Sequence, residues 1–168
     1  MKEECKSKIA RVRNDGRWHS RGSDWSTPQE LYNELDKEFH FTLDPCSTRE
    51  NHKCKKYFTI DDDGLTKDWS NEIVFMNPPY KGQTPKWVQK AYEESLRGAV
   101  VVCLLSAGVN RSYWHNFIFP YAAQILWIKG CIKFEDSKST APFASALIVF
   151  DNDKEKYSQK YVWGYPSK

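Results

Sequence analysis

The segment best equipped for chemistry is Asn77-Pro78-Pro79-Tyr80, whose groups suit a planar amine. Asn77 can offer its side-chain oxygen and Pro78 its carbonyl to the two hydrogens of an exocyclic amino group, while Tyr80 can stack on the attached ring. The nitrogen of such an amine is a poor nucleophile because its lone pair is delocalised into the ring. Two acceptors would favour a more nucleophilic, pyramidal nitrogen and stabilise the positive charge that develops when it bonds to carbon. This chemistry needs no activated Ser, Cys or His.

The residues before this segment place it at the end of a buried strand. Residues 72–76 are almost continuously apolar, which is typical of a strand covered on both faces in a parallel sheet. Neither proline has an amide N–H, so the chain must leave the sheet as a stiff, extended loop. Asp44-Pro45 ends a second, short strand at 41–45. Ligands bind outside the carboxyl ends of such strands, so we expect a site there; the alternative is a rigid surface turn.

Two segments carry the signals of a helix start. In the first, Thr27 can cap the free amides, Pro28 suits the first helical position, and an apolar stripe continues to Phe39. Thr84-Pro85 repeats this pattern before a second helix that ends at Gly98. A short helix is expected at 112–121. Further strands are expected at 57–60, 99–105, 124–128, 131–134 and 144–150, with an edge strand within 157–165.

The order of these elements predicts an α/β fold, a three-layer sandwich with a mostly parallel sheet. Residues 131–134 and 144–150 are expected to form a late antiparallel strand pair, joined by the polar loop 135–142. The 168 residues suggest one domain at 25–168, preceded by a basic, flexible arm at 1–24. That arm could contact nucleic acid or simply be solvated.

Composition excludes several classes of protein. No apolar run approaches the ~18–20 residues of a membrane span, and no secretory signal is recognisable. The net charge of +3 does not describe a histone-like polycation. Five cysteines without a CxxC pair suggest reduced thiols in the cytoplasm. Cys46, His52 and Cys54 have no evident fourth ligand, so we predict no metal.

Several motifs together resemble the phage-type DNA adenine methyltransferases, the Dam-like family, over residues 24–150. Asn-Pro-Pro-Tyr itself is similar to the catalytic motif of amino-methyltransferases that use S-adenosylmethionine (SAM). The other motifs are Trp25-Ser26-Thr27-Pro28, Phe41-x-Leu43-Asp44-Pro45-Cys46, Asp63-Gly64-Leu65 with Trp69, and Gly130-Cys131-Ile132-Lys133-Phe134. The resemblance implies an abbreviated, Rossmann-like fold and methyl transfer from SAM to the exocyclic 6-amino nitrogen of adenine in double-stranded DNA. It also implies a cytoplasmic location in a bacterial host, with the gene carried by a phage or prophage.

The resemblance assigns roles to individual residues. The catalytic pocket for a flipped adenine would comprise Asn77, Pro78, Pro79 and Tyr80. The cofactor would be bound by Trp25, Thr27, Pro28, Asp44, Pro45, Cys46, Asp62 and Asp63. Thr27 and Pro28 would close over its methionine end, near Asp44. The target base would meet Tyr80, Lys133 and Phe134, with Phe134 facing it.

The chain also departs from the family pattern. No glycine-rich turn follows Asp44, and residues 45–76 hardly leave room for two crossover helices before Asn77. A sizeable target-recognition domain is missing, so sequence choice must come from short loops, the arm or a partner copy. A monomer and a homodimer both remain open. The alternative functions are methylation of an RNA base or a protein glutamine amide, and a nucleic-acid-binding module without catalysis.

Overall fold

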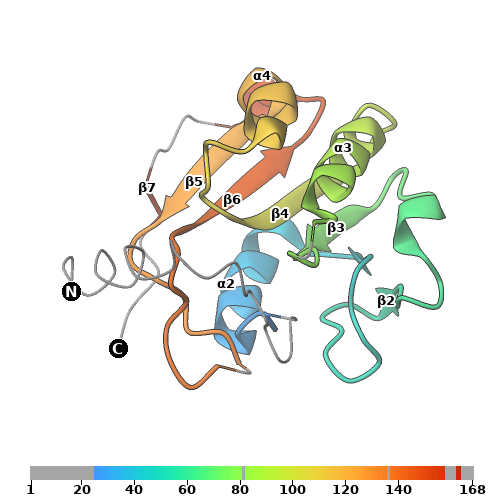
Figure 1. The fold of residues 1–168 in the computed structure, drawn as a ribbon. Helices are drawn as coiled ribbons and strands as arrows, with labels where there is room; N and C mark the ends of the chain where they lie inside the picture. Colours follow the sequence, from blue (N-terminus) through green and yellow to red (C-terminus); the bar gives the residue numbers. More distant parts are fainter. Residues whose placement is uncertain (1–24, 81, 136, 158–161, 164–168) are drawn as a thin grey trace.

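The computed structural model describes residues 25–80, 82–135, 137–157 and 162–163 (Figure 1). The arm predicted at 1–24 lies outside these described residues. A seven-stranded sheet forms the centre, in the order β2-β1-β3-β4-β6-β5-β7. The strands are β1 (Leu43–Asp44), β2 (Lys56–Tyr57), β3 (Ile73–Met76), β4 (Val100–Ser106), β5 (Gln124–Ile128), β6 (Ser145–Phe150) and β7 (Val162–Trp163).

Apolar side chains on both faces build the middle of the sheet. All six residues of β6 are buried, as are five of the seven in β4. The pairs β1–β2, β1–β3, β3–β4 and β5–β7 are parallel, whereas β6 runs antiparallel to both β4 and β5. A mostly parallel sheet with a late antiparallel strand, β6, is therefore confirmed, and β7 supplies the expected edge strand.

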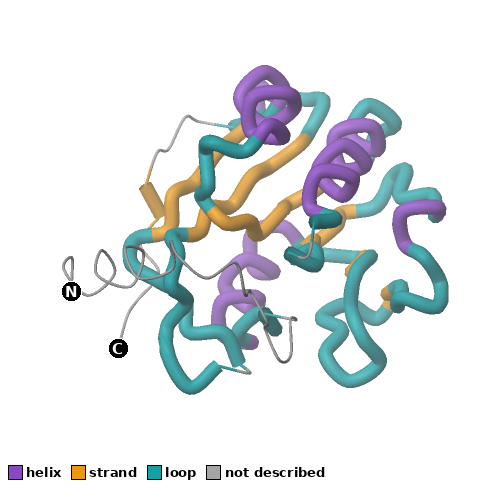
Figure 2. Tube along the Cα trace, in the orientation of Figure 1, coloured by secondary structure: helices purple, strands orange, loops and turns teal. Residues whose placement is uncertain are grey.

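Helices cover both faces of this sheet (Figures 1 and 2). Helix α2 (Gln29–Phe39) buries Leu31 and Leu35 in a core that also contains Phe75 of β3. On the other face, α3 (Thr84–Ser95) packs with a π-helical turn, η2 (Trp114–Ile118), and the short α4 (Phe119–Tyr121). The predicted three-layer α/β sandwich is confirmed. Two 3₁₀ turns complete the described elements, η1 (Gly64–Thr66) and η3 (Lys154–Lys156). No helix within the described ranges is long and apolar enough to cross a membrane.

The expected helix caps were wrong. Pro28 precedes the first turn of α2, but the amide of Gln29 donates to the carboxylate of Glu135 at 2.8 Å rather than to Thr27. Thr84 lies inside α3, and its hydroxyl donates to the carbonyl of Pro79 at 3.3 Å. At α2 a residue brought close by the tertiary fold replaces the local cap, whereas α3 has no side-chain cap.

The strand expected at 131–134 was also wrong. This segment is a loop, because its backbone groups bond outside the sheet: the amide of Ala141 donates to Ile132 at 2.7 Å, and that of Glu135 donates to Ser26 at 3.0 Å. The antiparallel partner of β6 is instead β5, in the register Ile125 to Ile148. The strand predicted at 57–60 is shorter and begins one residue earlier, as β2.

Candidate active site

A cavity of about 680 Å³ lies where β1 and β3 end. These strands are parallel neighbours, with Leu43 opposite Val74, so their carboxyl ends reach the same edge of the sheet. The predicted site residues that line the cavity are Trp25, Thr27, Asp44, Pro45, Cys46, Asp63, Asn77, Pro78 and Pro79. The lining does not include Pro28, Asp62, Tyr80, Lys133 or Phe134. The structure thus brings the Asp44 and Asn77 segments together around one hollow.

The side-chain amide of Asn77 is held by the segment that precedes α2. Its Nδ2 donates to the main-chain carbonyl of Trp25 at 2.6 Å and to the hydroxyl of Thr27 at 3.0 Å. Its Oδ1 is shielded from solvent and has no hydrogen-bond partner among the described residues. Such an unpaired acceptor costs about 1–3 kcal/mol, so we take it as a group reserved for a ligand.

Tyr80 lies behind the proline corner. Its phenol donates to the carbonyl of Leu104 at 3.4 Å, and its ring centroid is 5.8 Å from that of Phe143. Burial raises the pKa of the Tyr80 phenol, with a further contribution from Tyr113, so the hydroxyl stays protonated at neutral pH. Tyr80 therefore offers an aromatic face and a neutral donor rather than a base.

Phe143 joins Tyr80 to an aromatic cluster that the sequence did not reveal. The Trp25 ring lies 5.5 Å from Phe143 and 5.2 Å from Phe134. Phe134 is fully buried in this cluster, whereas Lys133 is exposed. An aromatic residue directly after the polar loop 135–142 was the available signal for Phe143.

Asp44 is a buried carboxyl in the wall of the cavity. It accepts hydrogen bonds from the main-chain amides of Lys53 at 3.0 Å and Cys46 at 3.4 Å. Burial raises its pKa to about 6, although both amides and the charges of His52 and Lys53 oppose this shift. A cationic ligand group beside Asp44 would relieve this cost. Burial also raises the pKa of the Cys46 thiol, as does the Asp44 carboxyl, so Cys46 is not a thiolate nucleophile.

Gly64, which follows the acidic turn at 61–63, packs against the loop that begins after Asp44. A Cβ added to Gly64 would lie 2.0 Å from the carbonyl oxygen of Pro45, so no other residue fits without displacing that loop. Asp63 reaches the cavity from this turn. Asp62 points elsewhere and accepts from the amide and hydroxyl of Thr59, both at 2.8 Å; these hydrogen bonds lower its pKa.

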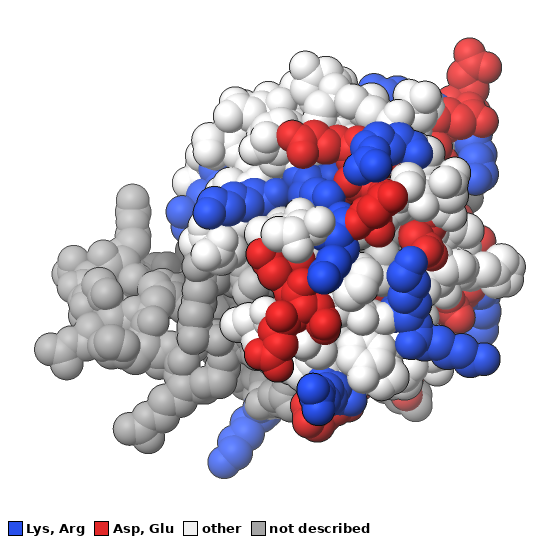
Figure 3. Space-filling view, turned by 90° about the vertical axis from the view of Figure 1, so that its right-hand side faces the viewer, with Lys and Arg blue, Asp and Glu red and all other residues white. Residues whose placement is uncertain are grey.

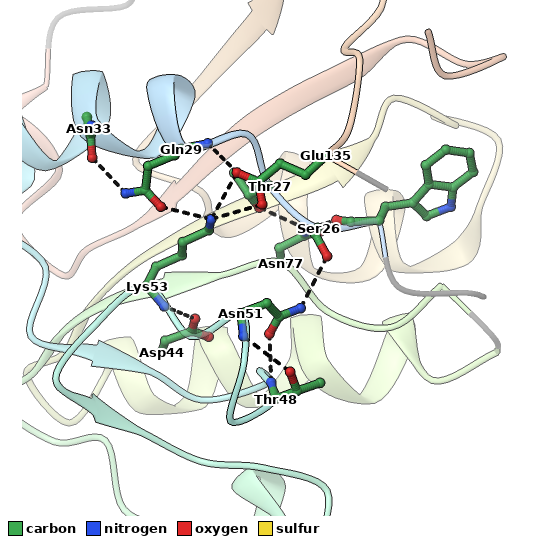
Figure 4. A network of polar contacts seen from close by, with 11 residues as sticks. Ser26, Thr27, Gln29, Asn33, Asp44, Thr48, Asn51, Lys53, Asn77 and Glu135 are labelled. Atoms are coloured by element: carbon green, nitrogen blue, oxygen red, sulfur yellow. Dashed lines mark hydrogen bonds and ion pairs between the residues drawn. The ribbon is translucent and has the colours of Figure 1, made fainter. Parts of the chain in front are cut away.

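A polar network that sequence reasoning missed joins three segments at the rim (Figure 4). Lys53 donates to Gln29 at 3.0 Å and lies 3.4 Å from the Glu135 carboxylate. Asn51 accepts from the amide of Thr48 at 2.8 Å. The partners of Lys53 lie 24 and 82 positions away in the chain, so sequence spacing gives no signal for these two contacts.

The candidate metal ligands and the surface charges bear on which ligands this region could bind. The described part of the chain contains no cluster of three metal-ligating side chains. His52 Nδ1 lies 2.9 Å from the carbonyl of Cys54, and its ring stacks on Tyr57 at 4.0 Å. The face in Figure 3 mixes acidic and basic side chains and shows no uniform basic surface.

Comparisons with known proteins show which family the chain is similar to. A family model described as "DNA N-6-adenine-methyltransferase (Dam)" matches residues 17–163. A protein of Haemophilus phage HP1 named DNA N-6-adenine-methyltransferase is 29% identical over 140 residues, covering 82% of this chain and 76% of that protein. A protein of the same name from Escherichia phage T1 is 32% identical over 107 residues, covering 62% of this chain and 44% of that protein.

Proposed function

This chain belongs to the DNA N-6-adenine-methyltransferase (Dam) family, and we propose that its cavity is where a methyl group passes from SAM to adenine in double-stranded DNA. It is a DNA adenine methyltransferase, acting on the 6-amino nitrogen. The observation that best supports this use of the cavity is Asn77, which lines it and keeps a buried, unpaired side-chain oxygen. We assign this oxygen to one hydrogen of the target amine, and the carbonyl of Pro78 to the other.

The cavity fits SAM in size and in chemistry. About 680 Å³ is within the range of cavities that hold small-molecule ligands. The buried Asp44 suits a cationic amino group, and Asp63 at the rim suits sugar hydroxyls. Ile60 lines the cavity yet is 93% exposed, so it offers an apolar surface that a planar ring could cover.

Bound SAM would supply a methyl group on a positively charged sulfur, with the carbon–sulfur bond breaking as the nitrogen–carbon bond forms. The acceptors on Asn77 and Pro78 would draw the amine hydrogens toward them and stabilise the positive charge that grows on nitrogen. The methylated nitrogen then loses its extra proton to water, which restores a neutral amine. Positioning the two reactants contributes the remaining rate enhancement.

The target adenine must leave the duplex before it can reach Asn77. Tyr80 directly follows the proline corner, and its ring contacts that of Phe143, at 5.8 Å between centroids. A base stacked between two rings needs about 7 Å between them, so we propose that Phe143 shifts outward when the base enters. The loop at 137–144 contains no helix or strand that would resist this movement.

The test uses purified protein, SAM with a labelled methyl group and unmethylated duplex DNA. We expect label in N6-methyl-2′-deoxyadenosine after nucleoside digestion and mass spectrometry. Parallel reactions contain single-stranded DNA, RNA and glutamine-containing peptides. Preferential labelling of RNA or peptide would refute the proposed acceptor, and calorimetry showing no SAM binding would refute catalysis in this cavity.

A further inference from the structure

We propose that Trp25–Thr27, the strap, is a positioning element that fixes which end of the Asn77 amide meets the target base. In particular, the hydroxyl of Thr27 is assigned the role of holding Nδ2, so that Oδ1 remains the acceptor for the amine. This inference rests on the proposed function, because it specifies how Asn77 is prepared for methyl transfer.

The hydrogen-bond partners determine the orientation of the amide. The Trp25 main-chain carbonyl can only accept, and it lies 2.6 Å from Nδ2. Rotating the amide by half a turn would place Oδ1 against that carbonyl and bring two acceptors together. The Thr27 hydroxyl, 3.0 Å from Nδ2, takes the second N–H. Both donors of Asn77 are therefore occupied by the strap, and Oδ1 is the remaining group.

The Thr27 hydroxyl can accept from Asn77 because Glu135, rather than Thr27, caps α2. A threonine directly before Pro28 would ordinarily bond to an amide in the first helical turn. Here the Glu135 carboxylate accepts from the amide of Gln29 at 2.8 Å, and no side-chain cap comes from the strap. Thr27 is only 3% exposed, so its hydroxyl needs a partner inside the protein, and Asn77 provides it.

The strap is itself anchored by both sides of the site. Its Ser26 carbonyl accepts from the amide of Glu135 at 3.0 Å, and its Ser26 hydroxyl accepts from Asn51 at 3.2 Å (Figure 4). Glu135 belongs to the loop after Phe134, whereas Asn51 belongs to the loop that follows Asp44 and lines the cavity. The orientation of Asn77 thus depends on contacts from both loops, even though neither loop touches its amide in a hydrogen bond.

The experiment removes the hydroxyl of Thr27 while keeping its shape. In Thr27→Val one N–H of Asn77 loses its acceptor, so the amide samples other orientations. We expect kcat to fall by about 10- to 100-fold, whereas the KM for DNA and the Kd for SAM should change by less than about twofold. Thr27→Ser keeps the acceptor and should restore most of the activity.

A control variant removes the hydroxyl of Thr42, the residue directly before β1. The Thr42 hydroxyl accepts from the amide of Ile73 at 2.9 Å, and Thr42 does not line the cavity. Thr42→Val should lower the unfolding temperature without lowering kcat. A fall in kcat for Thr27→Val that Thr42→Val matches would mean that the loss is structural, and the proposal would be wrong.

Two further outcomes would overturn the proposal. If Thr27→Val raises the Kd for SAM but keeps kcat at saturating SAM, Thr27 only contacts the cofactor. If neither parameter changes, the hydroxyl has no role. Should Thr27→Val fail to fold, the wild-type protein provides a second test by NMR. Both side-chain amide protons of Asn77 should then exchange slowly with solvent, and rapid exchange of both would refute the strap.

The NMR measurement also separates this proposal from the proposed function. If the wild-type protein does not methylate DNA, the proposed function fails. The exchange of the Asn77 amide protons would still show whether the strap holds Nδ2.

Discussion

The buried carboxyl of Asp44 should measurably change how the free energy of unfolding depends on pH. Burial raises its pKa from 3.8 to about 6 in the folded protein. The folded state therefore holds the Asp44 proton more tightly than the unfolded state does. This stabilising contribution is complete below about pH 4 and is lost as the pH rises through about 6.

The size of the effect follows from the shift. About two pKa units at 1.36 kcal/mol each correspond to about 3 kcal/mol. Asp44 is only 5% exposed, so solvent screening does not reduce this number substantially. Most of the change should fall between about pH 4 and pH 6, with a slope approaching about 1.4 kcal/mol per pH unit.

Urea unfolding of the wild type and of Asp44→Asn from pH 4 to pH 8 provides the assay. The difference between their unfolding free energies isolates Asp44, because the other carboxyls titrate alike in both proteins. The wild type should lose about 3 kcal/mol relative to the variant over this range. Without its charge, the variant should be the more stable protein at neutral pH.

The exposed Asp62 provides a control with the opposite sign. Hydrogen bonds from Thr59 lower its pKa, so its contribution is present at neutral pH and is lost as the pH falls. Asp62→Asn should therefore reduce stability slightly at neutral pH and not at low pH. A wild-type minus Asp44→Asn difference that stays flat, or that rises with pH, would refute a buried carboxyl with a raised pKa.

Two other substitutions test how the loops around the site are held. Gly64→Ala places a methyl group against the carbonyl of Pro45 and should lower the unfolding free energy by about 1–3 kcal/mol. It should also weaken SAM binding. An unchanged SAM affinity by calorimetry and an unchanged melting temperature would show that the Pro45 loop moves aside without cost. Glu135→Ala removes the acceptor for the amide of Gln29 and should cost about 1 kcal/mol, while Glu135→Gln keeps an acceptor and should cost less. Equal thermal denaturation of the two Glu135 variants would argue against the cap.

The central strands and the proline corner could be predicted because their signals are local. The continuous apolar run before Asn77 forms β3, and β5 has the predicted bounds. The length of such a run and the prolines that end it are properties of neighbouring residues. The placement of Asn77 and Asp44 at one edge then follows from the rule for parallel strands.

The remaining features depend on residues that meet only after folding. Glu135 takes the cap expected from Thr27, and a loop replaces the strand expected at 131–134. The roles of Phe143 and Lys53 arise from packing against distant segments. Local propensity gives the preferred partner of a backbone group only when no tertiary partner competes.

The most direct test of the account is a single-turnover measurement on Asn77→Ala with duplex DNA and saturating SAM. Loss of one acceptor at the reacting amine should slow methyl transfer by about 10²- to 10³-fold, while calorimetry should show that SAM still binds. Methyl transfer at the wild-type rate in Asn77→Ala would contradict the assignment of this amide oxygen to the target amine.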